Sequence, residues 1–193
     1  MRNKLEIGIL AVQGAFAEHA AMLEGLGAGT HLIRQASDLQ LPMDGLVLPG
    51  GESTVQGKLL RELGLFEPLK EKIEAGLPVF GTCAGMILLA KKLEGDPVTH
   101  FAVMDIRVRR NAYGRQLGSF LAHEAFGDLG KITMPFIRAP YIEEAGKEVQ
   151  VLATVDGHLV AAREKNMLAI SFHPEVTGET AVHRYFLHMI ENP

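Results

Sequence analysis

The chain has 193 residues and a mass of 21.0 kDa, a length that predicts one domain with its own hydrophobic core. Hydrophobic residues make up 47% and charged residues 22%, a composition that excludes intrinsic disorder. The net charge of −4 lacks the basic excess that nucleic-acid binding requires, and no apolar run is long enough to cross a membrane. A single cysteine is typical of a reducing compartment, so we expect a cytoplasmic protein.

In the first half of the chain, short apolar runs alternate with segments of helical periodicity. This alternation predicts an α/β fold with βαβ units around a mostly parallel sheet. The expected strands are 7–12, 30–34, 45–48 and 78–81, and the expected helices are 16–26, 53–63, 66–75 and 86–90. Ser53 or Thr54 is the expected cap of the second helix.

The second half changes character, because its segments alternate between apolar and polar residues and are separated by Gly, Pro and charges. We expect a mixed or antiparallel section there, then a buried strand over 167–172, a turn and an amphipathic helix over 179–190. Glu143 and Glu144 are expected in a solvated turn. No repeat or linker divides the chain, so 1–193 is expected to form one domain. The alternating segments are 103–109, 116–122, 132–137, 149–155 and 158–162.

The only cysteine lies in the sequence Gly-Thr-Cys-Ala-Gly over 81–85, between an expected strand and an expected helix. This spacing is typical of a nucleophile elbow, in which flanking glycines make room for a strained turn. Cys83 would then lie at a helix N-terminus, which favours its thiolate, and the Ala84 N–H could stabilise an oxyanion. The alternative is a small buried cysteine in a tight turn.

His173 is the candidate general base, since it follows the last expected strand and has Glu175 two residues later. Extended geometry would place both side chains on one side of the chain, so that the carboxylate orients the imidazole. Pro174 between them restricts the local backbone. Read alone, His-Pro-Glu is as consistent with an ordinary turn.

Other residues have less specific patterns. The turn Pro49-Gly50-Gly51-Glu52-Ser53 follows a strand and can direct N–H groups into a crevice, or it can be a plain strand-to-helix turn. One guanidinium among Arg107, Arg109, Arg110, Arg115 and Arg138 could hold a substrate carboxylate, although solvated positions suit most of them. His183 and His188 have no metal-pair spacing and suit surface or packing positions, and we expect no metal site.

Together these segments resemble the class I glutamine amidotransferases and, within them, the glutaminase subunits of pyridoxal 5′-phosphate synthases. The similarity extends over essentially the whole chain. Its motifs are Ala-Val-Gln-Gly-Ala over 11–15 with Glu18-His19, Leu-Pro-Gly-Gly-Glu-Ser-Thr over 48–54, Phe-Gly-Thr-Cys-Ala-Gly over 80–85, Arg-Asn over 110–111, Gly-Arg-Gln over 114–116, Phe-Ile-Arg-Ala-Pro over 136–140 and Phe-His-Pro-Glu over 172–175.

The resemblance implies a three-layer sandwich and hydrolysis of L-glutamine to glutamate and ammonia. It implies that Cys83 is the nucleophile, His173 the general base and acid, and Glu175 the residue that orients His173. By the same similarity, Gln13 lies where partner contact completes the site. The resemblance places the oxyanion hole at the N–H groups of Gly51 and Ala84 and glutamine binding at Gly51, Glu52, Ser53, Arg110, Ile137 and Arg138.

The implied partner is a TIM-barrel lyase subunit that takes the ammonia for vitamin B6 synthesis, in a large hetero-oligomer. We expect no cofactor on this chain, and weak basal activity that rises on docking, because 193 residues leave no room for a domain that uses the ammonia. Three alternatives remain: the glutaminase subunit of imidazole glycerol phosphate synthase, a non-catalytic partner-binding module, and a cysteine peptidase or γ-glutamyl hydrolase.

Overall fold

The computed structural model describes residues 4–112 and 118–193, so the expectations for Arg115 and for the Gly-Arg-Gln motif lie outside the described residues. None of the helices within these residues is both long and apolar enough to span a membrane. The helices are α1 (Phe16–Gly25), α2 (Ser53–Glu62), α3 (Phe66–Glu74), α4 (Ala84–Leu89) and α5 (Ala181–Glu191). The strands are β1 (Glu6–Leu10), β2 (Gly29–Ile33), β3 (Gly45–Leu48), β4 (Val79–Thr82), β5 (Ala90–Leu93), β6 (Met104–Arg109), β7 (Ser119–Ala125), β8 (Lys131–Ile137), β9 (Tyr141–Ala145), β10 (Gln150–Val155), β11 (His158–Glu164) and β12 (Met167–Ile170).

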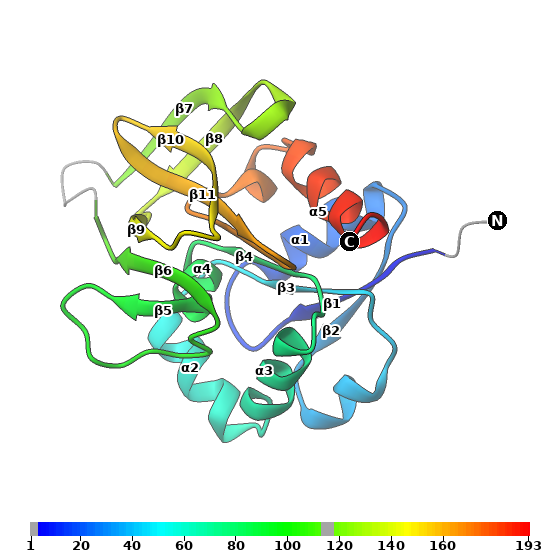
Figure 1. The fold of residues 1–193 in the computed structure, drawn as a ribbon. Coiled ribbons are helices and arrows are strands. Elements are labelled where there is room, and N and C mark those ends of the chain that lie inside the picture. Colours follow the sequence, from blue (N-terminus) through cyan, green and yellow to red (C-terminus); the bar gives the residue numbers. More distant parts are fainter. Residues whose placement is uncertain (1–3, 113–117) are drawn as a thin grey trace.

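A ten-stranded sheet forms the centre of the molecule (Figure 1). Its strands run in the order β2-β1-β3-β4-β12-β11-β9-β6-β5, and β10 pairs with β11 outside this path. The first five strands in this order, β2, β1, β3, β4 and β12, pair parallel with one another. Strand β11 pairs antiparallel with each of its neighbours, β12, β9 and β10. Strands β7 and β8 form a separate antiparallel hairpin. The mostly parallel first half and the mixed second half therefore confirm the predicted α/β class.

Apolar side chains alternate between the two faces of the central strands. Ile7 and Ile9 of β1 contact one core cluster, which includes Leu23 of α1 and Phe186 of α5. Leu10 belongs to the other cluster, which is formed with α2, α3 and α4. Figure 1 shows the same division, with α1 and α5 on one face of the sheet and α2 and α3 on the other. Because side chains of a strand point alternately to opposite faces, near-continuous apolar runs are buried by helices on both sides.

The pairing of β4 with β12 connects two segments that are distant in the sequence. The strands are parallel, with Thr82 opposite Ile170. The backbone N–H of Cys83 continues this ladder and donates to the carbonyl oxygen of Ile170 at 2.8 Å. The carboxyl ends of β4 and β12 therefore lie at the same edge of the sheet, where open α/β sheets place their ligand crevice.

Some expectations were wrong in detail. Strands β5 and β9 had no counterpart among the expected elements, and Glu143 and Glu144 lie in β9 rather than in a turn. Arg107 forms ion pairs with both carboxylates, at 3.6 Å to Glu143 and 2.5 Å to Glu144, and Arg109 binds Glu143 at 2.6 Å. These cross-strand pairs explain how such a charged segment forms a strand. Helix α2 begins at Ser53 itself after Glu52, without a hydroxyl cap.

The first prediction concerns Gly85, the second residue of α4, which packs against β3. A methyl group on Gly85 would overlap the carbonyl oxygen of Leu48, which belongs to the backbone and cannot rotate away. We expect Gly85→Ala to lower the free energy of unfolding in urea by about 1–3 kcal/mol. The control is Gly25→Ala in α1, where nothing lies within 4 Å of the added carbon. Equal stability of the two variants would contradict this packing account.

Candidate active site

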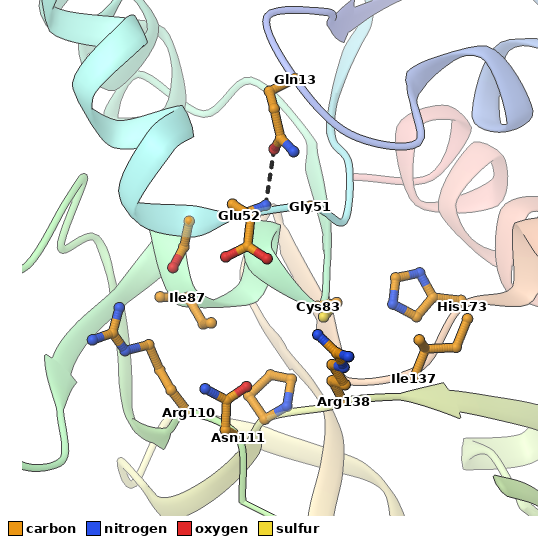
Figure 2. A pocket seen from close by; sticks show the side chains of 12 residues that line it. Gln13, Gly51, Glu52, Cys83, Ile87, Arg110, Asn111, Ile137, Arg138 and His173 are labelled. Carbon is orange, nitrogen blue, oxygen red and sulfur yellow. Dashed lines mark hydrogen bonds between the residues drawn. The ribbon is translucent and has the colours of Figure 1, made fainter. Parts of the chain in front are cut away.

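A cavity of about 350 Å³ opens at the edge of the sheet where β4 and β12 end. It contains eight of the ten predicted site residues, and Figure 2 shows the labelled side chains around Cys83. Glu175 and Ala84 do not line the cavity, because both are buried behind it. The lining residues are Gln13, Gly51, Glu52, Ser53, Cys83, Ile87, Arg110, Asn111, Ile137, Arg138, Pro140 and His173.

Cys83 has a strained backbone at the junction of β4 and α4. Its φ is 51° and its ψ is −101°, a conformation that residues with a Cβ rarely adopt. Two other residues that line the cavity, Asn111 and Arg138, also have positive φ, at 46° and 45°. Such backbone strain concentrates at functional sites, where the surrounding structure maintains it. The turn matches the predicted nucleophile elbow and directs Cys83 into the cavity.

His173 and Glu175 lie where β12 leaves the sheet. The residues 174–176 form a short 3₁₀ turn with Pro174 at its first position, which holds the two side chains on one side. Nδ1 of His173 and Oε1 of Glu175 are 2.6 Å apart, and the Glu175 side chain is fully buried. A carboxylate at this distance from Nδ1 leaves the other ring nitrogen free to face the thiol.

The pKa of His173 reflects these neighbours. Burial alone lowers this pKa, but the hydrogen bonds to Cys83 and Glu175, together with their charges, raise it to about 10. The imidazolium of His173, in contact with Cys83, is therefore the stable form at neutral pH. This arrangement can perform nucleophilic chemistry on a carbonyl carbon.

The glycine turn that follows β3 forms the opposite wall of the cavity. A side chain on Gly50 would collide with the imidazole of His173, so the turn can approach the base only with glycine there. Oε1 of Gln13 accepts a hydrogen bond from the Glu52 N–H at 2.8 Å (Figure 2). Nε2 of Gln56 donates to the carbonyl oxygens of Gln13 and Pro49, at 3.0 and 3.1 Å. These bonds connect the segment before α1 to the glycine turn.

Two of the candidate arginines line the cavity among the described residues: Arg110 and Arg138, which directly follows β8. The guanidinium of Arg110 donates to Asp96 at 3.0 Å and to the Thr54 hydroxyl at 3.2 Å. Sequence reasoning missed this role of Asp96, because the pairing crosses a loop and follows no local spacing. Together with Glu52, the two arginines supply charges of both signs at the cavity wall.

The two histidines of α5 have different environments. His188 is exposed, as a surface position requires, but His183 is completely buried. Nε2 of His183 lies 2.8 Å from Nδ1 of His19, a contact that the sequence did not indicate. Within residues 4–112 and 118–193, no cluster of three or more His, Cys, Asp or Glu side chains could hold a metal.

A second prediction tests the charge of Glu175. Glu175→Gln keeps the size of the side chain but removes the negative charge that stabilises the imidazolium. We expect the pKa of His173, measured by NMR titration of its ring protons, to fall from about 10 by about 1–3. The matched control is Glu67→Gln on the exposed face of α3, which should leave this pKa unchanged. An unaltered His173 pKa in Glu175→Gln would show that the carboxylate does not stabilise the charged base.

Comparisons with known proteins agree with this geometry. The model of the SNO glutamine amidotransferase family matches residues 9–192. A relative from Desulfitobacterium hafniense is 56% identical over 186 residues, covering 96% of this chain and 94% of the relative. One from Methanocorpusculum labreanum is 60% identical, with 96% and 98% of the two chains covered. Both relatives bear the name pyridoxal 5′-phosphate synthase subunit PdxT.

The fold has a solved counterpart as well. A crystal structure described as a glutamine amidotransferase superposes with a TM-score of 0.91 at 41% sequence identity. The match covers 96% of this chain and 98% of that structure. Since the family model covers nearly the entire sequence and the relatives exceed half identity, this chain belongs to the SNO glutamine amidotransferase family.

Proposed function

We propose that this chain hydrolyses L-glutamine to glutamate and ammonia with Cys83, His173 and Glu175. The observation that supports the proposal most strongly is the position of His173, which contacts both Cys83 and the buried Glu175 at the end of one cavity. An amide bond is stable in water, and a covalent intermediate divides its cleavage into two easier steps.

In the first step, the Cys83 thiolate attacks the side-chain amide carbon of glutamine and forms a C–S bond. The His173 imidazolium gives its proton to the departing nitrogen, the C–N bond breaks, and ammonia leaves a γ-glutamyl thioester. In the second step, the neutral imidazole takes a proton from water while the water oxygen attacks the thioester. The C–S bond then breaks and restores the thiolate and the imidazolium. The new carboxyl group gives its remaining proton to solvent, and glutamate leaves.

The cavity walls supply the other groups that this reaction needs. Both steps place negative charge on the carbonyl oxygen, and the N–H groups of Gly51 and Ala84 are the proposed oxyanion donors. Arg110 and Arg138 carry charges suited to the α-carboxylate of glutamine, and Glu52 a charge suited to its α-ammonium group. Ser53 and Ile137 complete the proposed binding site.

The ammonia is proposed to pass to the lyase subunit of a pyridoxal 5′-phosphate synthase, a TIM barrel that forms a large hetero-oligomer with this chain. The relatives named as subunits of that synthase support this assignment. We propose that residues 1–193 act as one glutaminase domain. A cytoplasmic location fits a reaction that needs the free thiol of Cys83, which a reducing compartment preserves.

The third prediction tests this function. With L-glutamine as substrate, we expect slow release of glutamate from the isolated chain and faster release when the lyase subunit is added. Cys83→Ala, which removes the nucleophile, should lower the rate in the complex by at least about 10³-fold. Glutamate release that is equal in the wild type and in Cys83→Ala would remove Cys83 from the mechanism. Activity on peptides or γ-glutamyl compounds, without activity on free glutamine, would show that the proposed substrate is wrong.

A further inference from the structure

Behind the catalytic residues lies a row of buried polar side chains, and two of them, His19 and His183, have no role in the proposed reaction. His19 of α1 and His183 of α5 have no exposed surface. Nδ1 of His19 is 2.8 Å from Nε2 of His183, and Nε2 of His19 is 3.1 Å from the Thr82 hydroxyl. The same Nε2 is 3.7 Å from Oε2 of Glu175, the carboxylate oxygen that His173 does not contact.

Both imidazoles are neutral. Burial lowers the pKa of His183 to about 4 and holds the pKa of His19 well below its ordinary value, and the charges of His183 and His173 lower the latter further. Each ring therefore has one N–H and one lone pair. Because the 2.8 Å contact between the two rings needs one donor and one acceptor, only two of the four tautomer combinations are compatible with it.

The environment selects one of these arrangements. If the proton of His183 were on Nδ1, a buried N–H would have no acceptor, since no described residue pairs with that atom. His19 would then direct a lone pair at the Glu175 carboxylate. With the proton on Nε2 of His183, that N–H donates to Nδ1 of His19, and the N–H of His19 points from Nε2 toward Thr82 and Glu175. The second arrangement costs less free energy, because no buried N–H of His183 is left without an acceptor. It also places the positive end of the His19 N–H dipole beside the carboxylate.

We propose that His19 is a positioning residue for the catalytic triad, held as its Nε2–H tautomer by His183. Its N–H faces two residues, each connected to one catalytic group: Thr82 directly precedes Cys83, and Glu175 orients His173. His19 does not touch the substrate cavity, so it acts through these two residues alone.

Oε2 of Glu175 supports this role. It is buried and has no hydrogen-bond partner among the described residues, so the His19 N–H is the donor that faces it across 3.7 Å. Oε1 of the carboxylate is therefore paired with His173, whereas Oε2 faces the N–H dipole of His19 at 3.7 Å, beyond hydrogen-bond distance. The titratable groups that face it are His19 and His173. Phe80 of β4 makes edge contacts with the rings of both His19 and His183.

A first experiment needs no substitution. In the full-length chain, the ¹⁵N chemical shifts of the imidazole nitrogens identify which atom of each neutral ring has the proton. We expect the Nε2–H tautomer for both His19 and His183 between pH 6 and 8. The Nδ1–H tautomer at either residue would overturn the proposal, because the N–H of His19 would not then face Glu175.

A pair of variants separates positioning from structural support. The amide nitrogen of Gln reaches the position of Nε2, whereas that of Asn reaches only the position of Nδ1. In the complex with the lyase subunit, we expect His19→Asn to lower kcat for glutamine hydrolysis about 10-fold or more with little change in KM, and His19→Gln to recover most of that loss. His188→Asn, an exposed change on α5, is the control and should behave as the wild type.

A second readout is independent of the proposed function on which this inference depends. Cys83 is the only cysteine, so its alkylation by iodoacetamide reports on the thiolate and imidazolium pair directly. We expect His19→Asn to slow alkylation near pH 6 by about threefold or more, because a loosened Glu175 no longer orients the charged imidazole of His173 toward Cys83, and to leave it unchanged near pH 10. His19→Gln should restore the rate near pH 6.

The outcomes distinguish the two claims. Equal losses in His19→Asn and His19→Gln that follow their melting temperatures, with alkylation profiles like that of the wild type, would overturn the positioning role. If the wild type in complex released no glutamate while the alkylation difference persisted, the proposed function would fail and the inference about His19 would stand.

Discussion

The arrangement of the site depends on one strand pairing. Strands β4 and β12 are separated by more than eighty residues, and the register that places Thr82 opposite Ile170 ends both strands at one edge of the sheet. The hydrogen bond from the Cys83 N–H to Ile170 extends this pairing into the strained turn. Without this register, the thiol and the imidazole would not meet, because no local contact between their sequence segments brings them together.

The charged and neutral states of the buried residues are set at the same edge of the sheet. Glu175 is enclosed completely, and a carboxylate in that position is stable only with a charged or hydrogen-bonded partner. The imidazolium of His173 supplies the charge, while the two imidazoles behind it remain neutral because burial opposes their protonation. The site thus contains three histidines with pKa values displaced in different directions, and only the one beside both Cys83 and Glu175 is charged.

Local pattern predicted much of this molecule. The apolar runs of the central strands and the Gly-Thr-Cys-Ala-Gly turn depend on neighbours in the sequence, so the sheet and the elbow could be derived from residues alone. The strand β9 could not, because its charges are balanced by Arg107 and Arg109 on β6. The resemblance to a family indicated the substrate side of the site, including Arg110, although it said nothing of the Asp96 carboxylate that holds this arginine.

The buried pair of histidines was the least predictable feature. His183 suited a packing position on an amphipathic helix, and His19 entered only as part of a family motif, with no local signal for a hydrogen bond between them. The two partners of His19, Thr82 and His183, lie 63 and 164 residues away in the chain and become its neighbours only when α1 and α5 pack on the same face of the sheet. Such long-range polar contacts leave no periodicity in the sequence, so a structure is needed to find them.

The central claim is that Cys83 forms a covalent bond with the substrate, and a trapped intermediate tests it most directly. The complex with the lyase subunit would be mixed with L-glutamine and quenched in acid within the first turnover, and the intact chain would be weighed by mass spectrometry. The account predicts an added γ-glutamyl group on Cys83 that decays as glutamate accumulates. Rapid single-turnover release of glutamate with the adduct on another residue, or with Cys83 still open to alkylation throughout, would contradict it.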